Sequence, residues 1–247
     1  MDFSFIVPSR GNWVDLKKMF DSFERTTKDK KNIEFLLAID IGTGENVPEL
    51  IKKEGYGFEI RCFYRPHSTW WSKDYFNFLA DRTVGDNICP FNDDAFMHTN
   101  HWDDKVRKHI KDSGWSIYLL DIPDSARIKY NHQFPCFPVI SRKGFVAIGY
   151  FFHEQVKVYP LDKIMFEMYL NAERIIKVDD VFIQHDHVVE TDPSKSELIK
   201  VFIEQRDNGE LNVDISKEVM ILLKFGQRDY IKNKSKLDKI IEIIREK

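Results

Sequence analysis

Apolar and polar positions along the first 120 residues follow two patterns, one typical of strands and one typical of helices, which alternate along the chain. Short apolar runs of the strand type are separated by segments whose apolar residues recur with a helical period. The strand candidates are FSFIV (3–7), IEFLLAI (33–39), FEIRCFY (58–64), DNICPF (86–91) and WSIYLL (115–120). The helix candidates are residues 12–26, 46–54 and 73–84. This alternation predicts an α/β fold with a mainly parallel, doubly wound sheet flanked by helices.

The second half of the chain follows a less regular pattern. Residues 137–154 mix apolar positions with two glycines, and we expect this segment to wrap the sheet. Residues 161–175 predict a helix, and residues 178–187 predict a strand that ends in two histidines. Beyond residue 190 the pattern predicts three helices. We therefore expect a main domain at 1–190 and a C-terminal helical extension at 191–247, packed on or beside it.

Composition and charge exclude several classes of function. The 247 residues include 43% hydrophobic ones, which is enough for the core of one large domain. The net charge of -3 gives no general reason to expect a nucleic-acid partner. The N-terminal apolar run is too short for a signal peptide, and no run approaches the roughly 18 residues of a membrane span. We expect a cytoplasmic protein without an integral membrane segment.

The three cysteines, Cys62, Cys89 and Cys136, are widely spaced. Their number is odd, and no two of them form a CxxC pair. This pattern is typical of buried thiols in a reducing compartment, and it favours neither a disulfide framework nor a zinc site.

Polar residues follow three of the predicted strands. They are Pro8, Ser9 and Arg10 after the first strand, Asp40 after the second, and Asn92, Asp93 and Asp94 after the fourth. In doubly wound sheets, ligands bind at the carboxyl ends of the strands, so we expect these groups to converge on one edge. Adjacent carboxylates repel each other unless a proton, a cation or open water relieves them. The convergence favours a metal site over a solvated turn.

Two histidines supply further candidate ligands. His185 and His187 are two positions apart in a predicted strand, so both face the same side. A carboxylate and an imidazole, with water and phosphate oxygens completing the shell, suit Mn²⁺ or Mg²⁺.

At this point the chain resembles a known family. The segments that carry the resemblance are FSFIVPSRGNWVDLKKMFDSF, IEFLLAID, DNICPFNDDAF, GFVAIGYFFHEQVKVYPLD and VFIQHDH. Their order over residues 3–190 resembles that of family 2-like glycosyltransferases with the GT-A fold, which use nucleotide-diphosphate sugars.

The resemblance implies roles for the residues at the strand ends. Asp40 would contact the nucleotide base, and Asp93 would reach the ribose or the donor sugar. Asp94, with His187 and then His185, would hold Mn²⁺ or Mg²⁺ at the diphosphate. The full set of donor-binding candidates is Pro8, Ser9, Arg10, Asp40, Lys73, Asn92 and Asp93.

The acceptor side depends on a single predicted base. The resemblance implies that Asp162 deprotonates the acceptor hydroxyl. Leu161 stands where the family has a second acid, so Glu154 is the alternative base. Asn92 is a further departure, since it stands at the usual first acid of the metal motif.

These inferences predict a metal-dependent, inverting glycosyltransferase of the hexosyltransferase type that uses a UDP-sugar. The sequence does not decide whether the acceptor is a glycan, a lipid-linked molecule or a protein. One alternative is a non-catalytic domain that binds sugar nucleotides or glycans. The other is a metal-dependent phosphodiesterase, which usually carries a denser set of carboxylates and histidines.

Overall fold

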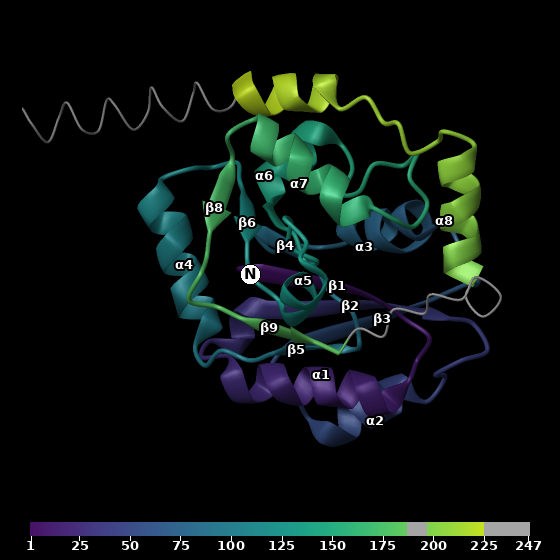
Figure 1. Cartoon of the computed structure of the whole chain (residues 1–247). Helices are drawn as coiled ribbons and strands as arrows, with labels where there is room; N and C mark the ends of the chain where they lie inside the picture. The colour runs from purple at the N-terminus through teal and green to yellow at the C-terminus, as the bar shows by residue number, and fades with distance from the viewer. Residues whose placement is uncertain (187–196, 225–247) are drawn as a thin grey trace, which may run out of the picture.

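The computed structural model describes residues 1–186 and 197–224. Within them a seven-stranded sheet has the order β3-β2-β1-β4-β7-β6-β8, and β5 and β9 form a small second sheet (Figure 1). The strands are β1 (Phe3–Ser9), β2 (Ile33–Asp40), β3 (Glu59–Arg65), β4 (Asn87–Pro90), β5 (Ala95–Met97), β6 (Leu119–Asp121), β7 (Val139–Ser141), β8 (Ile175–Lys177) and β9 (Ile183–His185).

Helices connect these strands. They are α1 (Trp13–Thr26), α2 (Val47–Glu54), α3 (Phe78–Ala80), α4 (Trp102–Ser113), α5 (Ser125–Tyr130), α6 (Arg142–Ile148), α7 (Leu161–Asn171) and α8 (Glu197–Asp207). A 3₁₀ turn, η1 (Lys30–Asn32), precedes β2, and a π-helix, η2 (Ser72–Asn77), runs directly into α3. Residues 216–224 are also helical.

Strand direction decides which chain segments meet at the functional edge. β1 is parallel to β2 and β4, β2 is parallel to β3, and β6 is parallel to β8. β7 is antiparallel to both of its neighbours, β4 and β6. The carboxyl ends of β1, β2, β4 and β6 therefore share one edge with the amino end of β7. The predicted α/β fold with a mainly parallel sheet is confirmed.

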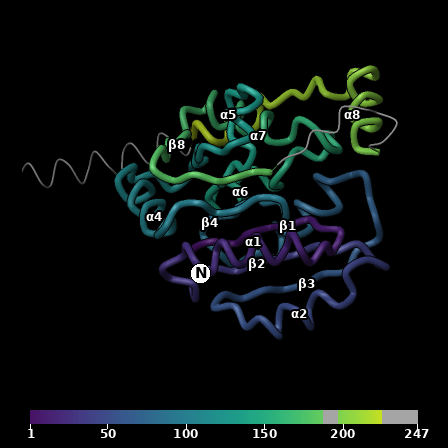
Figure 2. The backbone as a smooth tube through the Cα atoms, turned by 60° about the horizontal axis from the view of Figure 1, so that its bottom comes forward, coloured from purple at the N-terminus to yellow at the C-terminus, as the bar shows by residue number. Residues whose placement is uncertain are grey.

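The sheet buries both faces, which explains why its central strands read as continuous apolar runs. Phe5 of β1 belongs to a core cluster that includes Phe20 and Phe23 of α1. Ile6, the next residue, belongs to a second cluster with Met165 and Tyr169 of α7. Figure 1 shows α1 and α7 on opposite sides of the sheet, and Figure 2 follows the sheet from β3 at one end of the molecule to β8 at the other.

Three details of the second half differ from expectation. Residues 139–141 do not wrap the sheet but enter it as β7, between β4 and β6. The helix predicted over 161–175 ends at Asn171, because Glu173 takes a left-handed conformation (φ 56°) and turns the chain into β8. Of the strand predicted over 178–187, only β9 forms among the described residues, and it pairs with β5.

The described part of the C-terminal segment packs against the α7 side. The side-chain carbonyl of Gln205 in α8 accepts a hydrogen bond from the Lys157 backbone (2.9 Å), and its amide donates to the Gln155 carbonyl (3.1 Å). Leu222 is fully buried in the second core cluster. The division at residue 190 stays a prediction. Among residues 1–186 and 197–224, no helix combines the length and apolarity needed to cross a membrane.

Candidate nucleotide and metal site

Ser9 and Asp93 join the ends of the two central strands. The Ser9 hydroxyl donates to Asp93 Oδ2 (2.6 Å) and accepts from the Gly11 backbone N–H (2.9 Å). Burial raises the pKa of Asp93 to about 6, and the neighbouring Asp94 carboxylate acts in the same direction, while the Ser9 hydrogen bond opposes it. The edge thus holds a carboxyl group that titrates near neutral pH.

Asp94 and His185 meet through the small second sheet. Ala95 of β5 pairs with His185 of β9, and the Asp186 backbone donates to the Asp94 carbonyl (3.0 Å). This pairing places His185 Nε2 3.3 Å from Asp94 Oδ1. A carboxylate and an imidazole side by side suit Mn²⁺ better than Mg²⁺, which prefers oxygen ligands. His187 lies outside the described residues.

Asp40 ends β2 with both carboxylate oxygens engaged. Its Oδ1 accepts from the Tyr75 hydroxyl (2.5 Å), and its Oδ2 lies 2.7 Å from His67 Nδ1. The opposite ring nitrogen of His67 lies 3.0 Å from Glu197 Oε2 in α8. These two carboxylates, Asp40 first, raise the pKa of His67. Sequence reasoning missed His67, although it follows β3 much as Asp40 ends β2.

The other donor-binding candidates occupy two places. Pro8 pairs with Ala38 within the sheet, and Asn92 lies two residues after the end of β4, so both lie at the edge formed by Ser9 and Asp93. Arg10 is exposed in the loop after β1. Lys73 is exposed on η2, where its Nζ lies 5.2 Å from the centre of the Trp70 ring.

Asp162 and Glu154, the two candidate bases, have different surroundings. Asp162 lies in the first turn of α7, and its carboxylate accepts from the Lys163 backbone (2.8 Å). Burial raises the pKa of Asp162 to about 7; the Asp124 carboxylate adds to the rise, and His185 opposes it. Glu154 is exposed, and its backbone carbonyl accepts from the Trp70 indole (2.9 Å). Asp162 is therefore tuned towards neutral pH.

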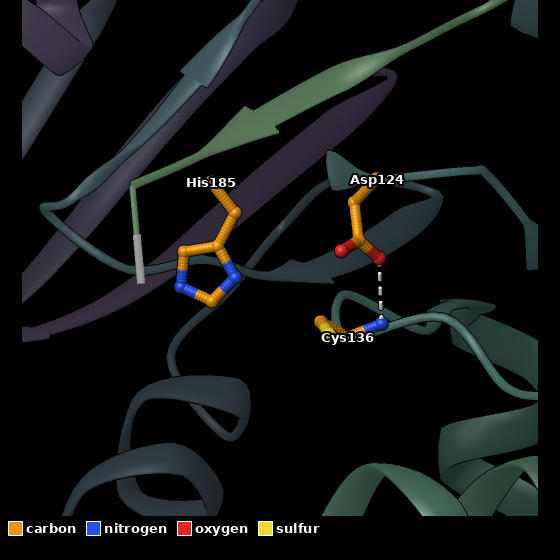
Figure 3. A group of neighbouring side chains, drawn as sticks. All are labelled: Asp124, Cys136 and His185. Atoms are coloured by element: carbon orange, nitrogen blue, oxygen red, sulfur yellow. Dashed lines mark hydrogen bonds between the residues drawn. The ribbon is translucent and has the colours of Figure 1, made fainter. Parts of the chain in front are cut away.

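A further group, which sequence reasoning missed, adjoins His185. Asp124, Cys136 and His185 each offer one ligand atom, and these atoms lie within 4.8 Å of one another. Figure 3 shows the three side chains around a common space. The group forms because β6 ends and β7 begins at the same edge, next to β9. Cysteine spacing carries no sign of it, since its members are far apart in the chain.

No family model and no curated protein matches the sequence. Solved structures do match. Mannosyltransferase PcManGT from Pyrobaculum calidifontis, in complex with GDP-Man and Mn²⁺, superposes with a TM-score of 0.63 and 10% identity, over 94% of this chain and 75% of that one. S. aureus TarS 1–349 with UDP-GlcNAc gives a TM-score of 0.60 and 15% identity, over 93% and 73%.

GalNAc-T7 with UDP, GalNAc and Mn²⁺ gives a TM-score of 0.59 and 11% identity, over 93% of this chain and 54% of that one. At these identities the likeness concerns the fold. The chain has the GT-A-like fold of nucleotide-sugar glycosyltransferases, as the order of its sequence motifs predicted.

Proposed function

We propose that this chain is a metal-dependent glycosyltransferase that moves a sugar from a nucleotide-diphosphate sugar, preferably a UDP-sugar, to an acceptor hydroxyl with inversion. One observation carries the proposal: the Ser9–Asp93 hydrogen bond and the Asp94–His185 contact meet at the carboxyl edge of a GT-A-like sheet. The ligands of the similar structures support it, since they are UDP, UDP-GlcNAc, GDP-Man and Mn²⁺.

The donor would bind along the edge that Pro8, Arg10, Asn92 and Asp93 line. Asp40 would accept an N–H group of the base, and its carboxylate is already oriented by Tyr75 and His67. A uracil offers one such N–H group, and UDP or a UDP-sugar is bound in two of the similar structures, which is why we favour UDP. The Asp93 carboxylate would accept hydrogen bonds from hydroxyl groups of the ribose or the donor sugar.

Asp94 and His185 fit a divalent cation by their chemistry, and His187 is the third proposed ligand. Mn²⁺ or Mg²⁺ held there would neutralise negative charge on the diphosphate leaving group. Asp94, directly before β5, and His185, at the end of β9, would hold it from two separate parts of the chain.

Asp162 would act on the acceptor. Its carboxylate takes the proton from the acceptor hydroxyl while that oxygen forms a bond to the anomeric carbon. The bond between the anomeric carbon and the diphosphate oxygen breaks, and its electron pair leaves with the nucleoside diphosphate. A single displacement of this kind inverts the configuration. A base with a pKa near 7 is well matched to a neutral medium.

A thermal-shift panel of nucleotide sugars, with and without Mn²⁺, tests the proposal. We expect one UDP-sugar to stabilise the chain with Mn²⁺ present, by about 2.7 kcal/mol when the ligand is at 100 times its Kd. Transfer to an acceptor then separates an enzyme from a domain that only binds. Cleavage of phosphodiesters with no response to any sugar nucleotide would favour the phosphodiesterase instead.

A further inference from the structure

The Asp124–Cys136–His185 group combines three kinds of metal ligand: a carboxylate, a thiol and an imidazole. Asp124 is fully buried, His185 is 7% exposed, and Cys136 keeps partial exposure. We propose that this group, the thiol site, binds one thiophilic divalent cation of the Zn²⁺ type. It is distinct from the cation proposed at Asp94, although the two share His185.

Contacts around the thiol site hold its ligands in place. Asp124 Oδ1 accepts from the Arg127 backbone (2.8 Å), and Oδ2 accepts from the backbone of Cys136 itself (3.0 Å). The Ser125 hydroxyl accepts from the His185 backbone N–H (2.7 Å) and donates to the His185 backbone carbonyl (3.0 Å). The two bonds to Asp124 set the orientation of its carboxylate, the kind of contact that commonly governs metal affinity. The Ser125 bonds hold the backbone that carries His185.

The donor set selects the class of ion. Zn²⁺ takes thiolate, imidazole and carboxylate ligands at about 2.0–2.3 Å, and a site with three protein ligands leaves a fourth position open. Ligand atoms within 4.8 Å of one another need small side-chain rotations to reach that geometry. Thiolate and carboxylate together neutralise a divalent charge in this buried place, as the thiol proton is released on binding. Mg²⁺ prefers an all-oxygen shell and is disfavoured.

If the proposed function holds, the thiol site and the donor's cation compete for His185. His185 Nε2 lies 3.3 Å from Asp94, so one imidazole serves both places. An ion at the thiol site draws His185 away from Asp94 and leaves the donor's cation with a poorer shell. Zn²⁺ is therefore expected to raise the Mn²⁺ concentration needed for UDP binding.

Cobalt spectroscopy on the full chain tests the site directly. Co²⁺ replaces Zn²⁺ and shows a near-ultraviolet sulfur-to-metal absorption only when a thiolate binds it. We expect the absorption to saturate at one thiolate-bound Co²⁺ per chain, and this ion to be displaced by Zn²⁺ but not by Mg²⁺. Cys136→Ser should abolish the band, whereas Cys62→Ser, a change in another half-buried cysteine, should leave it intact.

Asp124→Asn provides a second variant. Asn keeps the helix cap at Arg127, but its amide nitrogen cannot accept from the Cys136 backbone, so thermal unfolding of the metal-free variant is measured as a control. The substitution should weaken Co²⁺ binding at least about tenfold, the lower bound seen for mutation of residues around metal ligands. A wild-type chain without the band, or a band that survives Cys136→Ser, overturns the thiol site. A persistent band in a chain that binds no sugar nucleotide overturns the proposed function and leaves the thiol site standing.

Discussion

Burial acts in the same direction on two carboxyl groups of the candidate site, because water no longer stabilises their charged forms. It raises the pKa of Asp93 to about 6 and that of Asp162 to about 7. For Asp162 the consequence concerns catalysis, since only the ionised carboxylate accepts a proton. Acid therefore switches off the proposed base at a pH where ordinary aspartates are still ionised.

Asp162→Asn is expected to lower turnover by about two to four orders of magnitude, the range of general acid–base catalysis. Donor affinity should hardly change, because this side chain would face the acceptor. In the wild type, kcat should rise with pH up to about 7 and then level off, and the variant should lose this dependence. If Glu154→Gln is the inactive variant instead, the base is Glu154.

Asp94→Asn is expected to abolish Mn²⁺-dependent UDP binding, measured by calorimetry, with the thermal stability of the unliganded chain unchanged. The side chain is partly exposed, so its loss removes a cation ligand without opening a core cavity. His187→Ala should also lower the affinity for Mn²⁺, and His185→Ala should lower it less. Asp112→Asn, on the exposed end of α4, is the control. Unchanged UDP affinity in Asp94→Asn would show that Asp94 binds no cation.

At the scale of elements, long apolar strands are predictable and short ones are not. β1 and β2 are 7 and 8 residues long and buried on both faces, so their runs stand out in the sequence. β7 and β8 have 3 residues each, too few to show a period. β6, also 3 residues long, was found only because the predicted run at 115–120 overlaps it. The strand-end acids were therefore found from the sequence. The thiol site was not, because it needs the reversed direction of β7.

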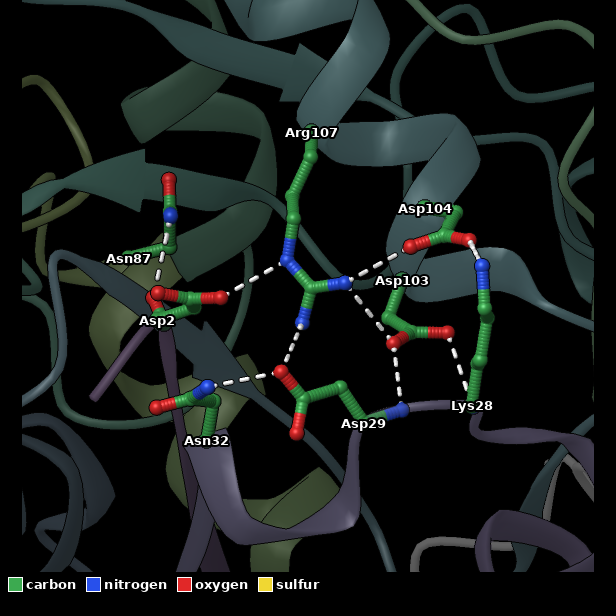
Figure 4. Close-up of polar contacts among 8 residues, drawn as sticks. All are labelled: Asp2, Lys28, Asp29, Asn32, Asn87, Asp103, Asp104 and Arg107. Carbon is green, nitrogen blue, oxygen red and sulfur yellow. Dashed lines mark hydrogen bonds and ion pairs between the residues drawn. The ribbon is translucent and has the colours of Figure 1, made fainter.

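Arg107 of α4 joins the N-terminus and the segment after α1 to its own helix, at the opposite ends of the strands (Figure 4). Its guanidinium contacts Asp2 (2.7 Å), Asp103 (2.9 Å) and Asp29 (3.8 Å). The Asp103 side chain is fully buried and also accepts from the backbones of Lys28 (3.0 Å) and Asp29 (2.9 Å). The cluster ties the N-terminus and the segment after α1 to α4.

Arg107→Ala is expected to lower the free energy of unfolding by about 3 kcal/mol, because it leaves Asp103 buried without its cation. Lys108→Ala, the next position in the same helix, removes an exposed pair with Asp112 (2.8 Å) and should cost less than about 1 kcal/mol. Urea unfolding of both variants gives the comparison. Equal losses would mean that the Arg107 cluster adds no stability of its own.

At the scale of the whole molecule, Leu222 shows that the helix at 216–224 contributes to the second core cluster. Leu222→Ala should cost about 2–5 kcal/mol by leaving a cavity in the cluster that contains Phe166 and Tyr169. Leu223 is 37% exposed, and its change to Ala should cost about 0.5 kcal/mol. Thermal unfolding of the two variants measures the difference. Similar losses would mean that this helix docks without a fixed set of contacts.

The distance along the chain between paired strands bears on the order in which the molecule assembles. β1 and β2, which pair from Phe3 and Ile33, are joined by a short crossover through α1, and β3 follows through α2. The Asp94–His185 contact closes a much longer loop and needs β5 and β9 together. Because long-range contacts form late, refolding chains should regain helical circular dichroism before they regain nucleotide binding. A chain that has just left the ribosome would thus be compact for some time before it can recognise a donor.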